Sequence, residues 1–277
     1  MLGLGLSLTV ADFARVLKQP KAVIVALLCQ LLILPVICFG LVLMFQLPPV
    51  LAVGMMMLAA SPGGTTANLY SHLFRGDIAL NISLTAVNSV IAVITLPVIT
   101  NFAIWYFRPF DDQLGLQWAK AIEVFAIVLL PVAAGMLIRR FWPRFADGMD
   151  RPVRIASVII LVVVIAGAVA SNWKLLVDNF AQLALITILF CLISLTIGFF
   201  VPRMLKIGRR QAIASSFEIG IHNATLAIVI AQSVLGSMEL SLPAAVYGVL
   251  MFFVAFGFGF LIRGKARVPD SESRGAS

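Results

Sequence analysis

Uninterrupted apolar runs restrict this chain to a helical membrane fold. Ile78–Phe107, Asn179–Pro202 and Leu240–Ile262 each lack Lys, Arg, Asp and Glu. Each run exceeds the roughly 20 residues that cross a bilayer as a helix, and a helix satisfies its own backbone hydrogen bonds, as lipid requires. Charged residues make up only 12% of the chain, about half the share in soluble domains. The sequence therefore predicts an all-α polytopic membrane protein.

Connectors with many basic residues alternate along the chain with connectors that have few. Of the 20 Lys and Arg residues, 17 lie in every second connector and in the tail, and the others are Arg108, Lys120 and Lys174. Because basic residues concentrate on the cytoplasmic side, we expect a multi-pass protein of the inner (plasma) membrane with a cytoplasmic C-terminus. Residues 264–277 should form a disordered cytoplasmic tail. The net charge of +8 thus reflects topology, which makes membrane lipid an expected partner and nucleic acid an unexpected one.

Apolar runs bounded by charges and turn residues predict about nine membrane segments. The first is too short to span the bilayer alone, and the third and eighth are interrupted. The segments are Met1–Ala14, Pro20–Phe45, Val50–Phe74, Ile78–Phe107, Leu114–Ile138, Val153–Asn172, Asn179–Pro202, Gln211–Leu235 and Leu240–Ile262.

The two interruptions are related. Pro62, Gly63 and Gly64 break the first segment, and Gly220 lies in the break of the second. The charge pattern places the two broken segments in opposite orientations. We therefore expect inverted five-helix repeats, an N-terminally incomplete one at residues 1–112 and a second at 113–263, with the first helix of the plan absent from this chain. Paired discontinuous helices in such repeats indicate the binding site of a secondary transporter.

Glu218 is the only acidic residue between Gln211 and Met238. An ionised acid at the centre of a membrane helix costs about 2.5–3.5 kcal/mol, and no predicted helix interior contains a Lys or Arg that could pair with it. Glu218 is therefore a candidate to bind a small cation or a proton. The alternative is a neutral glutamic acid that is hydrogen-bonded in a packed helix pair.

Neutral oxygen donors accompany this acid. Asn81, Thr85 and Asn88 follow one helix face with spacing i, i+4 and i+7, and Asn68 and Asn223 lie beside the breaks. Such residues can coordinate Na⁺, although single polar residues more often join helices. Gln30 could likewise either coordinate Na⁺ or join helices. His222 could either belong to the ion site or form a hydrogen bond with Glu218.

The second half of each broken helix begins with exposed backbone N–H groups, which favour an anion. Thr65, Thr66 and Asn223 lie at these starts and are candidates to bind a substrate carboxylate. No motif of a hydrolase, metalloprotease or nucleotide-binding enzyme is present, and the three cysteines lack metal-ligand spacing. We therefore expect no enzyme activity, no cofactor and no transition metal, with Na⁺ as the only ion.

Two stretches resemble the crossing-helix motifs of the bile acid:sodium symporter family, SPGGTTANLYSHLFRGDIALNISLTAVNS (61–89) and FEIGIHNATLAIVIA (217–231). The N-terminal MLGLGLSLTVADFARVLKQPKAVIVALLCQLLILP is similar to the second and third helices of that family. The resemblance implies ten helices in two inverted repeats, a panel domain, a core domain and two sodium sites. By position it implies a first sodium site at Asn68, Asn81, Thr85 and Glu218, a second at Gln30, Glu218, His222 and the carbonyls of Ile219 and Ile221, and substrate contacts at Thr65 and Asn223.

Three positions depart from the family pattern. Ala67 and Asn81 stand where serine is frequent in the family. His222 stands where glutamine is usual, so the sequence leaves open whether the second site binds sodium. The apolar stretch 250–253 lacks the polar residues of bile-acid-binding relatives, so bile acid is not the expected substrate.

Together these features predict a monomeric symporter that couples Na⁺ to an organic anion, such as a small carboxylate or an amphipathic acid, by alternating access. Proton coupling through Glu218 and His222 is the alternative within this class. A membrane sensor without transport is the alternative from another class.

Overall fold

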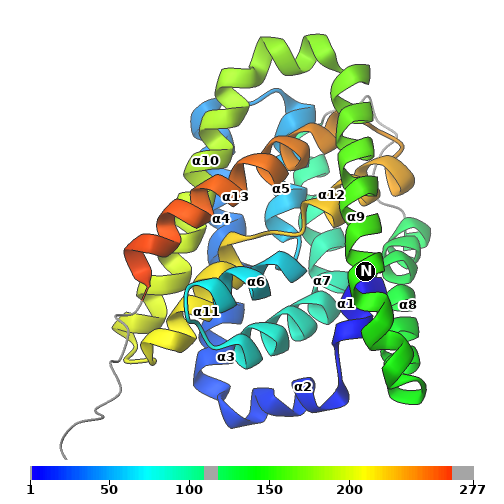
Figure 1. Cartoon of the computed structure of the whole chain (residues 1–277). Helices are drawn as coiled ribbons and strands as arrows, with labels where there is room; N and C mark the ends of the chain where they lie inside the picture. The colour runs from blue at the N-terminus through cyan, green and yellow to red at the C-terminus, as the bar shows by residue number, and fades with distance from the viewer. Residues whose placement is uncertain (1, 109–117, 264–277) are drawn as a thin grey trace, which may run out of the picture.

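The computed structural model describes residues 2–108 and 118–263, and these residues form helices joined by short turns (Figure 1). The α-helices are α1 (Leu2–Ser7), α2 (Val10–Arg15), α3 (Pro20–Leu28), α4 (Leu34–Phe45), α5 (Pro49–Ala60), α6 (Thr65–Leu73), α7 (Ile78–Phe107), α8 (Trp118–Phe141), α9 (Pro143–Ser171), α10 (Trp173–Met204), α11 (Arg209–Gly220), α12 (Ala224–Val229) and α13 (Leu242–Ile262). Four short helical turns join them: η1 (Val16–Lys18), η2 (Cys29–Ile33), η3 (Ile230–Val234) and η4 (Glu239–Ser241). The predicted tail at 264–277 lies outside the described residues.

Several of these helices match a membrane in length and composition. Pro20–Phe45, α7, α10 and Glu239–Ile262 are the 4 that, within the described part of the chain, are long and apolar enough to cross a bilayer. The all-helical membrane fold is therefore confirmed. The connections α6–α7, α8–α9 and α10–α11, which contain or adjoin basic residues, all lie in the lower half of Figure 1.

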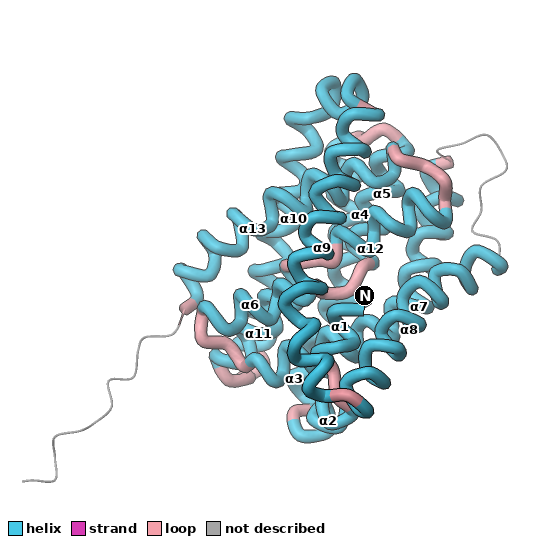
Figure 2. Tube along the Cα trace, turned by 45° about the vertical axis from the view of Figure 1, so that its right-hand side comes forward, coloured by secondary structure: helices cyan, strands magenta, loops and turns pink. Residues whose placement is uncertain are grey.

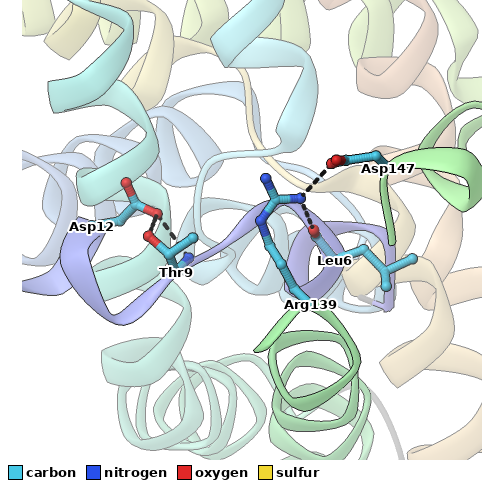
Figure 3. A network of polar contacts seen from close by, with 5 residues as sticks. All are labelled: Leu6, Thr9, Asp12, Arg139 and Asp147. Carbon is cyan, nitrogen blue, oxygen red and sulfur yellow. Dashed lines mark hydrogen bonds and ion pairs between the residues drawn. The ribbon is translucent and has the colours of Figure 1, made fainter. Parts of the chain in front are cut away.

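The predicted short first segment is divided into two helices, α1 and α2. At the break, the Asp12 carboxylate accepts hydrogen bonds from the Thr9 backbone N–H (2.8 Å) and hydroxyl (2.7 Å). The Arg139 guanidinium of α8 donates to the Leu6 carbonyl at the end of α1 (2.9 Å) and pairs with Asp147 of α9 (3.2 Å), as Figure 3 shows. Polar side chains thus satisfy the backbone groups that two helix ends leave unpaired.

The helices form two groups. One extended hydrophobic core is built from buried side chains of α3–α7 and α10–α13. Helices α1, α8 and α9 pack against one another instead. A separate small cluster of Leu8, Ala86 and Val132 lies where the α1–α2 connection and α8 meet α7. The contact between the groups is therefore less extensive than the core within the larger one.

Two glycines allow α1 and α8 to cross closely. A Cβ atom at Gly135 would lie 2.6 Å from the Leu6 nitrogen and 2.7 Å from the Leu2 carbonyl oxygen, and a Cβ at Gly5 would meet the Val132 backbone. The obstructing atoms belong to the backbone, so they cannot rotate away. The crossing therefore requires the absence of a side chain at both positions.

We expect Gly135→Ala to destabilise the protein by about 1–3 kcal/mol, the usual cost of overpacking. The measurement is the thermal unfolding midpoint in detergent. Gly148→Ala in α9 is the matched control, because nothing lies within 4 Å of a Cβ at Gly148. In that control, an alanine inside a helix should be stabilising by roughly 0.5–1 kcal/mol. Equal midpoints for the two variants would contradict the close crossing.

Candidate functional site at the crossing of two broken helices

The two helix breaks meet in space as a short antiparallel pair. Helix α5 ends at Ala60 and α6 begins at Thr65, while α11 ends at Gly220 and α12 begins at Ala224. Gly63 pairs with His222, the Gly64 N–H donates to the Ile221 carbonyl (3.0 Å), and the Asn223 N–H donates to the Pro62 carbonyl (2.8 Å). Each loop thus satisfies backbone groups of the other, as irregular backbone at membrane depth requires. Figure 2 shows these loops in the middle of the molecule, away from the loops at the helix ends.

Glycine is needed where the first loop passes Glu218. A Cβ atom at Gly63 would overlap the Glu218 carboxyl group and lie 2.7 Å from its backbone carbonyl oxygen. The absence of this side chain brings the loop directly onto the carboxylate. Gly220, at the end of α11, similarly leaves room for the side chain of Leu195.

Glu218 is fully buried and its carboxyl group faces α7. Its Oε2 atom accepts a 2.5 Å hydrogen bond from the Thr85 hydroxyl, and the Asn81 Nδ2 group donates to the Ala214 carbonyl (2.8 Å) on α11. Within the described residues no Lys or Arg forms an ion pair with Glu218. The buried oxygen atoms without a hydrogen-bond partner include Glu218 Oε1, Asn68 Oδ1, Asn81 Oδ1 and Asn88 Oδ1.

This set of oxygens suits a hard cation. A buried polar atom without a partner costs about 1–3 kcal/mol, so a carboxylate and three amide oxygens of this kind on three packed helices call for an explanation. One carboxylate and several neutral oxygens are the ligands that hard cations prefer. The described residues contain no group of three His, Cys, Asp or Glu that could hold a transition metal. These oxygens on α6, α7 and α11 are therefore of the kind that could hold a hard cation.

A second polar cluster lies on the other side of the crossing. Gln30 Nε2 donates to the Ser61 carbonyl (3.1 Å), and His222 Nδ1 lies 3.2 Å from the same oxygen. Gln30 Nε2 also lies 3.5 Å from His222 Nδ1, so Nδ1 donates to the Ser61 carbonyl in one tautomer of the imidazole and accepts from Gln30 in the other. Gln30 Oε1 and His222 Nε2 are buried without partners. The ring is stacked on Phe190 at 5.3 Å and meets the edge of Tyr247 at 5.5 Å.

Three features of this second cluster were not predicted from the sequence. Gln30 lies in the π-helical turn η2, and such turns occur frequently at functional sites. The Tyr247 hydroxyl donates to the Gly220 carbonyl (2.8 Å) and anchors the end of α11. Ser61 takes part through its carbonyl, which no side-chain pattern reveals. A tyrosine in an apolar span was the one available signal, because a buried hydroxyl needs a partner.

The remaining predicted residues separate into an open and a closed side. Thr65 is exposed and Thr66, Asn68 and Asn223 are half-buried, whereas Ile219 and Ile221 are fully buried. Asn223 Oδ1 caps α12 by accepting the Leu226 N–H (3.0 Å). Helix α6 begins without any side-chain cap. The open side thus comprises Thr65 and the half-buried residues beside it, whereas Glu218 and Asn81 lie on the closed side.

A helical membrane protein whose two broken helices cross beside a buried carboxylate has the architecture of a secondary transporter. Comparison with known proteins agrees. Residues 1–179 match the model of the sodium bile acid symporter family, and the chain belongs to this family.

Three relatives illustrate the similarity. The chain is 30% identical over 253 residues to "Probable sodium/metabolite cotransporter BASS1, chloroplastic" of Arabidopsis thaliana, covering 90% of this chain and 61% of the relative. It is 27% identical over 250 residues to "Uncharacterized sodium-dependent transporter YocS" of Bacillus subtilis, covering 90% and 76%. It is 27% identical over 251 residues to "Probable sodium/metabolite cotransporter BASS2, chloroplastic" of Oryza sativa, covering 91% and 59%. The chain thus spans about three fifths of the two plant proteins. These names describe transport rather than catalysis.

Proposed function

We propose that the protein is a sodium-coupled symporter of an organic anion, such as a small carboxylate or an amphipathic acid. The observation that carries this proposal is the buried Glu218 carboxylate, which lies among partnerless oxygens from three helices at the crossing of two broken ones. Membership of the sodium bile acid symporter family supports the coupling ion. We place the protein as a monomer in the inner (plasma) membrane, with its C-terminus in the cytoplasm.

Bound Na⁺ fixes the arrangement of the helices that cross beside its site. The ion binds Glu218, Asn68 and Asn81, with Thr85 and Asn88 on the same face of α7. Because these residues come from α6, α7 and α11, bound Na⁺ holds the half-helix α6 in a defined position. The first turns of α6 and α12, with Thr65, Thr66 and Asn223, then face the anion. A substrate carboxylate and Na⁺ therefore stabilise the same arrangement of the crossing from opposite sides.

The two groups of helices provide the moving parts. Helices α1, α8 and α9 correspond to the panel domain that the family resemblance implies, and the others to the core domain with the site. Residues 1–112 and 113–263 form the two inverted repeats of a ten-helix plan. The small cluster of Leu8, Ala86 and Val132 is the contact across which the two domains shift during alternating access.

We expect transport to depend on one sodium ion, with a Hill coefficient of about 1. With the His222 proton on Nδ1, Gln30 and His222 both donate to the Ser61 carbonyl, so this oxygen has no free lone pair for a second ion. His222→Gln should raise the coefficient toward about 2, because an amide can donate to Ser61 and still offer an oxygen. Sodium titration of initial uptake rates measures both values, and a sigmoidal wild-type curve would contradict the assignment.

Proton coupling is the second candidate, favoured by one contact. The Thr85 hydroxyl lies within hydrogen-bond distance of both Glu218 Oε2 (2.5 Å) and the Asn81 carbonyl (3.0 Å). A hydroxyl has one proton, so a protonated Glu218 would complete this chain by donating to Thr85.

The deciding experiment uses purified protein in liposomes. A thermal-shift screen of organic anions, with and without sodium, first identifies a ligand. Uptake of that ligand is then driven by a sodium gradient at fixed pH, or by a proton gradient without sodium. Sodium-driven uptake supports the first candidate. Uptake that requires only the proton gradient supports the second, and binding without exchange rejects both.

A further inference from the structure

A ladder of polar residues leads away from the cation site between α7 and α11. Asp77, which caps the start of α7, and Asn81 and Thr85 within that helix have spacing i, i+4 and i+8. On α11, Gln211, Ser215 and Glu218 have spacing i, i+4 and i+7. Both rows of polar residues run along the helix pair from Glu218 toward the end of the molecule where Arg209 and Arg210 lie.

Direct contacts join the two helices at each level of this ladder. Thr85 donates to Glu218 at the level of the cation site. One turn further along α7, Asn81 donates to the carbonyl of Ala214. At the last level the Asp77 N–H donates to the Arg210 carbonyl (2.9 Å). The two polar faces are therefore adjacent along their whole length.

The middle level contains oxygens that lack partners. Ser71 Oγ, Asn81 Oδ1 and Ser215 Oγ are buried and make no hydrogen bond. Ser71 belongs to α6, one turn after Asn68, and α6 packs on both α7 and α11. Gly76, whose N–H donates to the Ser71 carbonyl (2.7 Å), lies against Ile213 and Ala214 of α11.

Buried serines elsewhere in these helices behave differently. Ser83 and Ser89 of α7 donate to the carbonyls four residues earlier, at 2.9 and 2.7 Å. Ser216, the neighbour of Ser215, donates to the Leu195 carbonyl at 2.7 Å. A buried serine in a helix normally finds such an acceptor. Ser71 and Ser215 do not, so their oxygens are free to accept a cation.

The ladder ends at an open cleft of about 510 Å³, lined by Asp77, Gly208, Arg209, Arg210 and Gln211. The Asp77 carboxylate stands at its inner wall, where Gln19 Nε2 donates to it (3.1 Å) and Gln211 donates to Gln19 in turn (2.9 Å). The Arg209 guanidinium is directed to the carbonyls of Ile262 and Arg263 at the end of α13. The other Asp77 carboxylate oxygen accepts from the Leu80 N–H (3.0 Å), and Asp77 is the acidic residue among those that line the cleft, beside Arg209 and Arg210.

We propose that Ser71, Asn81 and Ser215 form a transient sodium site, halfway along a route that connects Glu218 with the cleft at Asp77. This inference rests on the proposed sodium coupling. Successive levels are about one helical turn apart, roughly 5.4 Å, so the ion exchanges ligands stepwise without crossing apolar surface. The route runs on the closed side of the crossing, so sodium and the organic anion leave through different openings.

The direct test uses Ag⁺, a thiol-reactive monovalent cation, on Ser215→Cys protein whose three native cysteines have been replaced. Ser216→Cys is the matched control, since this neighbouring residue lies off the route. We expect Ag⁺ added on the side of the cleft to modify Ser215→Cys at least about tenfold faster than the control, with saturating sodium slowing the reaction. Labelling of the remaining thiol after denaturation measures the rate without any transport assay. Equal rates, or faster reaction from the opposite side, would overturn the route.

A kinetic test covers the case in which a cysteine disturbs the packing. The Ser71→Ala, Ser215→Ala double variant should keep the equilibrium sodium affinity, measured by thermal shift, because neither serine touches the ion at Glu218. Its exchange of radioactive sodium across liposome membranes should be about tenfold slower, whereas Ser83→Ala, Ser89→Ala protein should exchange normally. Exchange at the wild-type rate would contradict the transient site. Absence of any sodium-dependent uptake by wild-type protein would instead reject the proposed function, so the two failures are distinguishable.

Discussion

Glu218→Gln should abolish sodium-stimulated uptake while leaving the protein folded and inserted. Glutamine retains the size of the side chain and can still bond to Thr85, but it removes the one negative charge at the site. Removing one partner of a buried ion pair costs about 3–5 kcal/mol, so the apparent sodium affinity should fall by about 100-fold or more. Sodium titration of uptake, together with thermal stability with and without sodium, measures the loss.

Glu239→Gln is the matched control for this experiment. Glu239 lies in η4 and is only half-buried, and it touches neither polar cluster of the crossing. Its replacement should leave the sodium titration unchanged. Wild-type sodium dependence in Glu218→Gln would reject the cation site. Loss of sodium dependence in both variants would point to a general effect of acidic residues on folding.

Gly63→Ala should inactivate the transporter and lower its stability. The added methyl group would occupy the space of the Glu218 carboxyl group, so either the loop or the carboxylate must move. Overpacking of this kind costs about 1–3 kcal/mol, and a displaced carboxylate loses its hydrogen bond with Thr85. We expect a thermal midpoint lowered by roughly 2–8 °C and sodium-dependent uptake reduced to background.

The control for Gly63→Ala is Gly257→Ala in α13, where a Cβ atom has nothing within 4 Å. That variant should transport normally and be as stable as wild type or more stable. If Gly63→Ala retains uptake and sodium affinity, the close approach of the loop to Glu218 is not needed for function. Thermal shift with sodium then shows whether the carboxylate has kept its position.

Much of the fold could be predicted because its signals are local. The bounds Ile78–Phe107 of α7 agree with prediction, since Asp77 caps the start of the helix and Arg108 ends the apolar run. The interruptions between Ala60 and Thr65 and after Gly220 also agree, because Pro and Gly disfavour helix wherever they occur. Each of these signals lies within a few residues of the feature that it predicts.

The division of the first segment into α1 and α2 could not be predicted in this way. Residues 1–14 read as a single apolar segment, yet the helix ends near Leu6 and begins again after Thr9. Asp12 supplies a local reason, since its carboxylate binds the Thr9 N–H in place of a helix carbonyl. The other half of the reason is Arg139, which satisfies the Leu6 carbonyl from 133 residues away.

The sequence by itself determined that the chain lies in a lipid bilayer and which segments are helices. It also determined where two of these helices break and which polar residues they contain. Charge and hydropathy act on each segment separately, so these properties need no knowledge of the neighbours. Only the tertiary structure decided which polar atoms are satisfied. Thr85 and Glu218 meet across 133 residues, and Ser215 is left without a partner while Ser216 finds one in Leu195. That difference depends on which helices pack together, and it separates the residues that can bind an ion from those that only join helices.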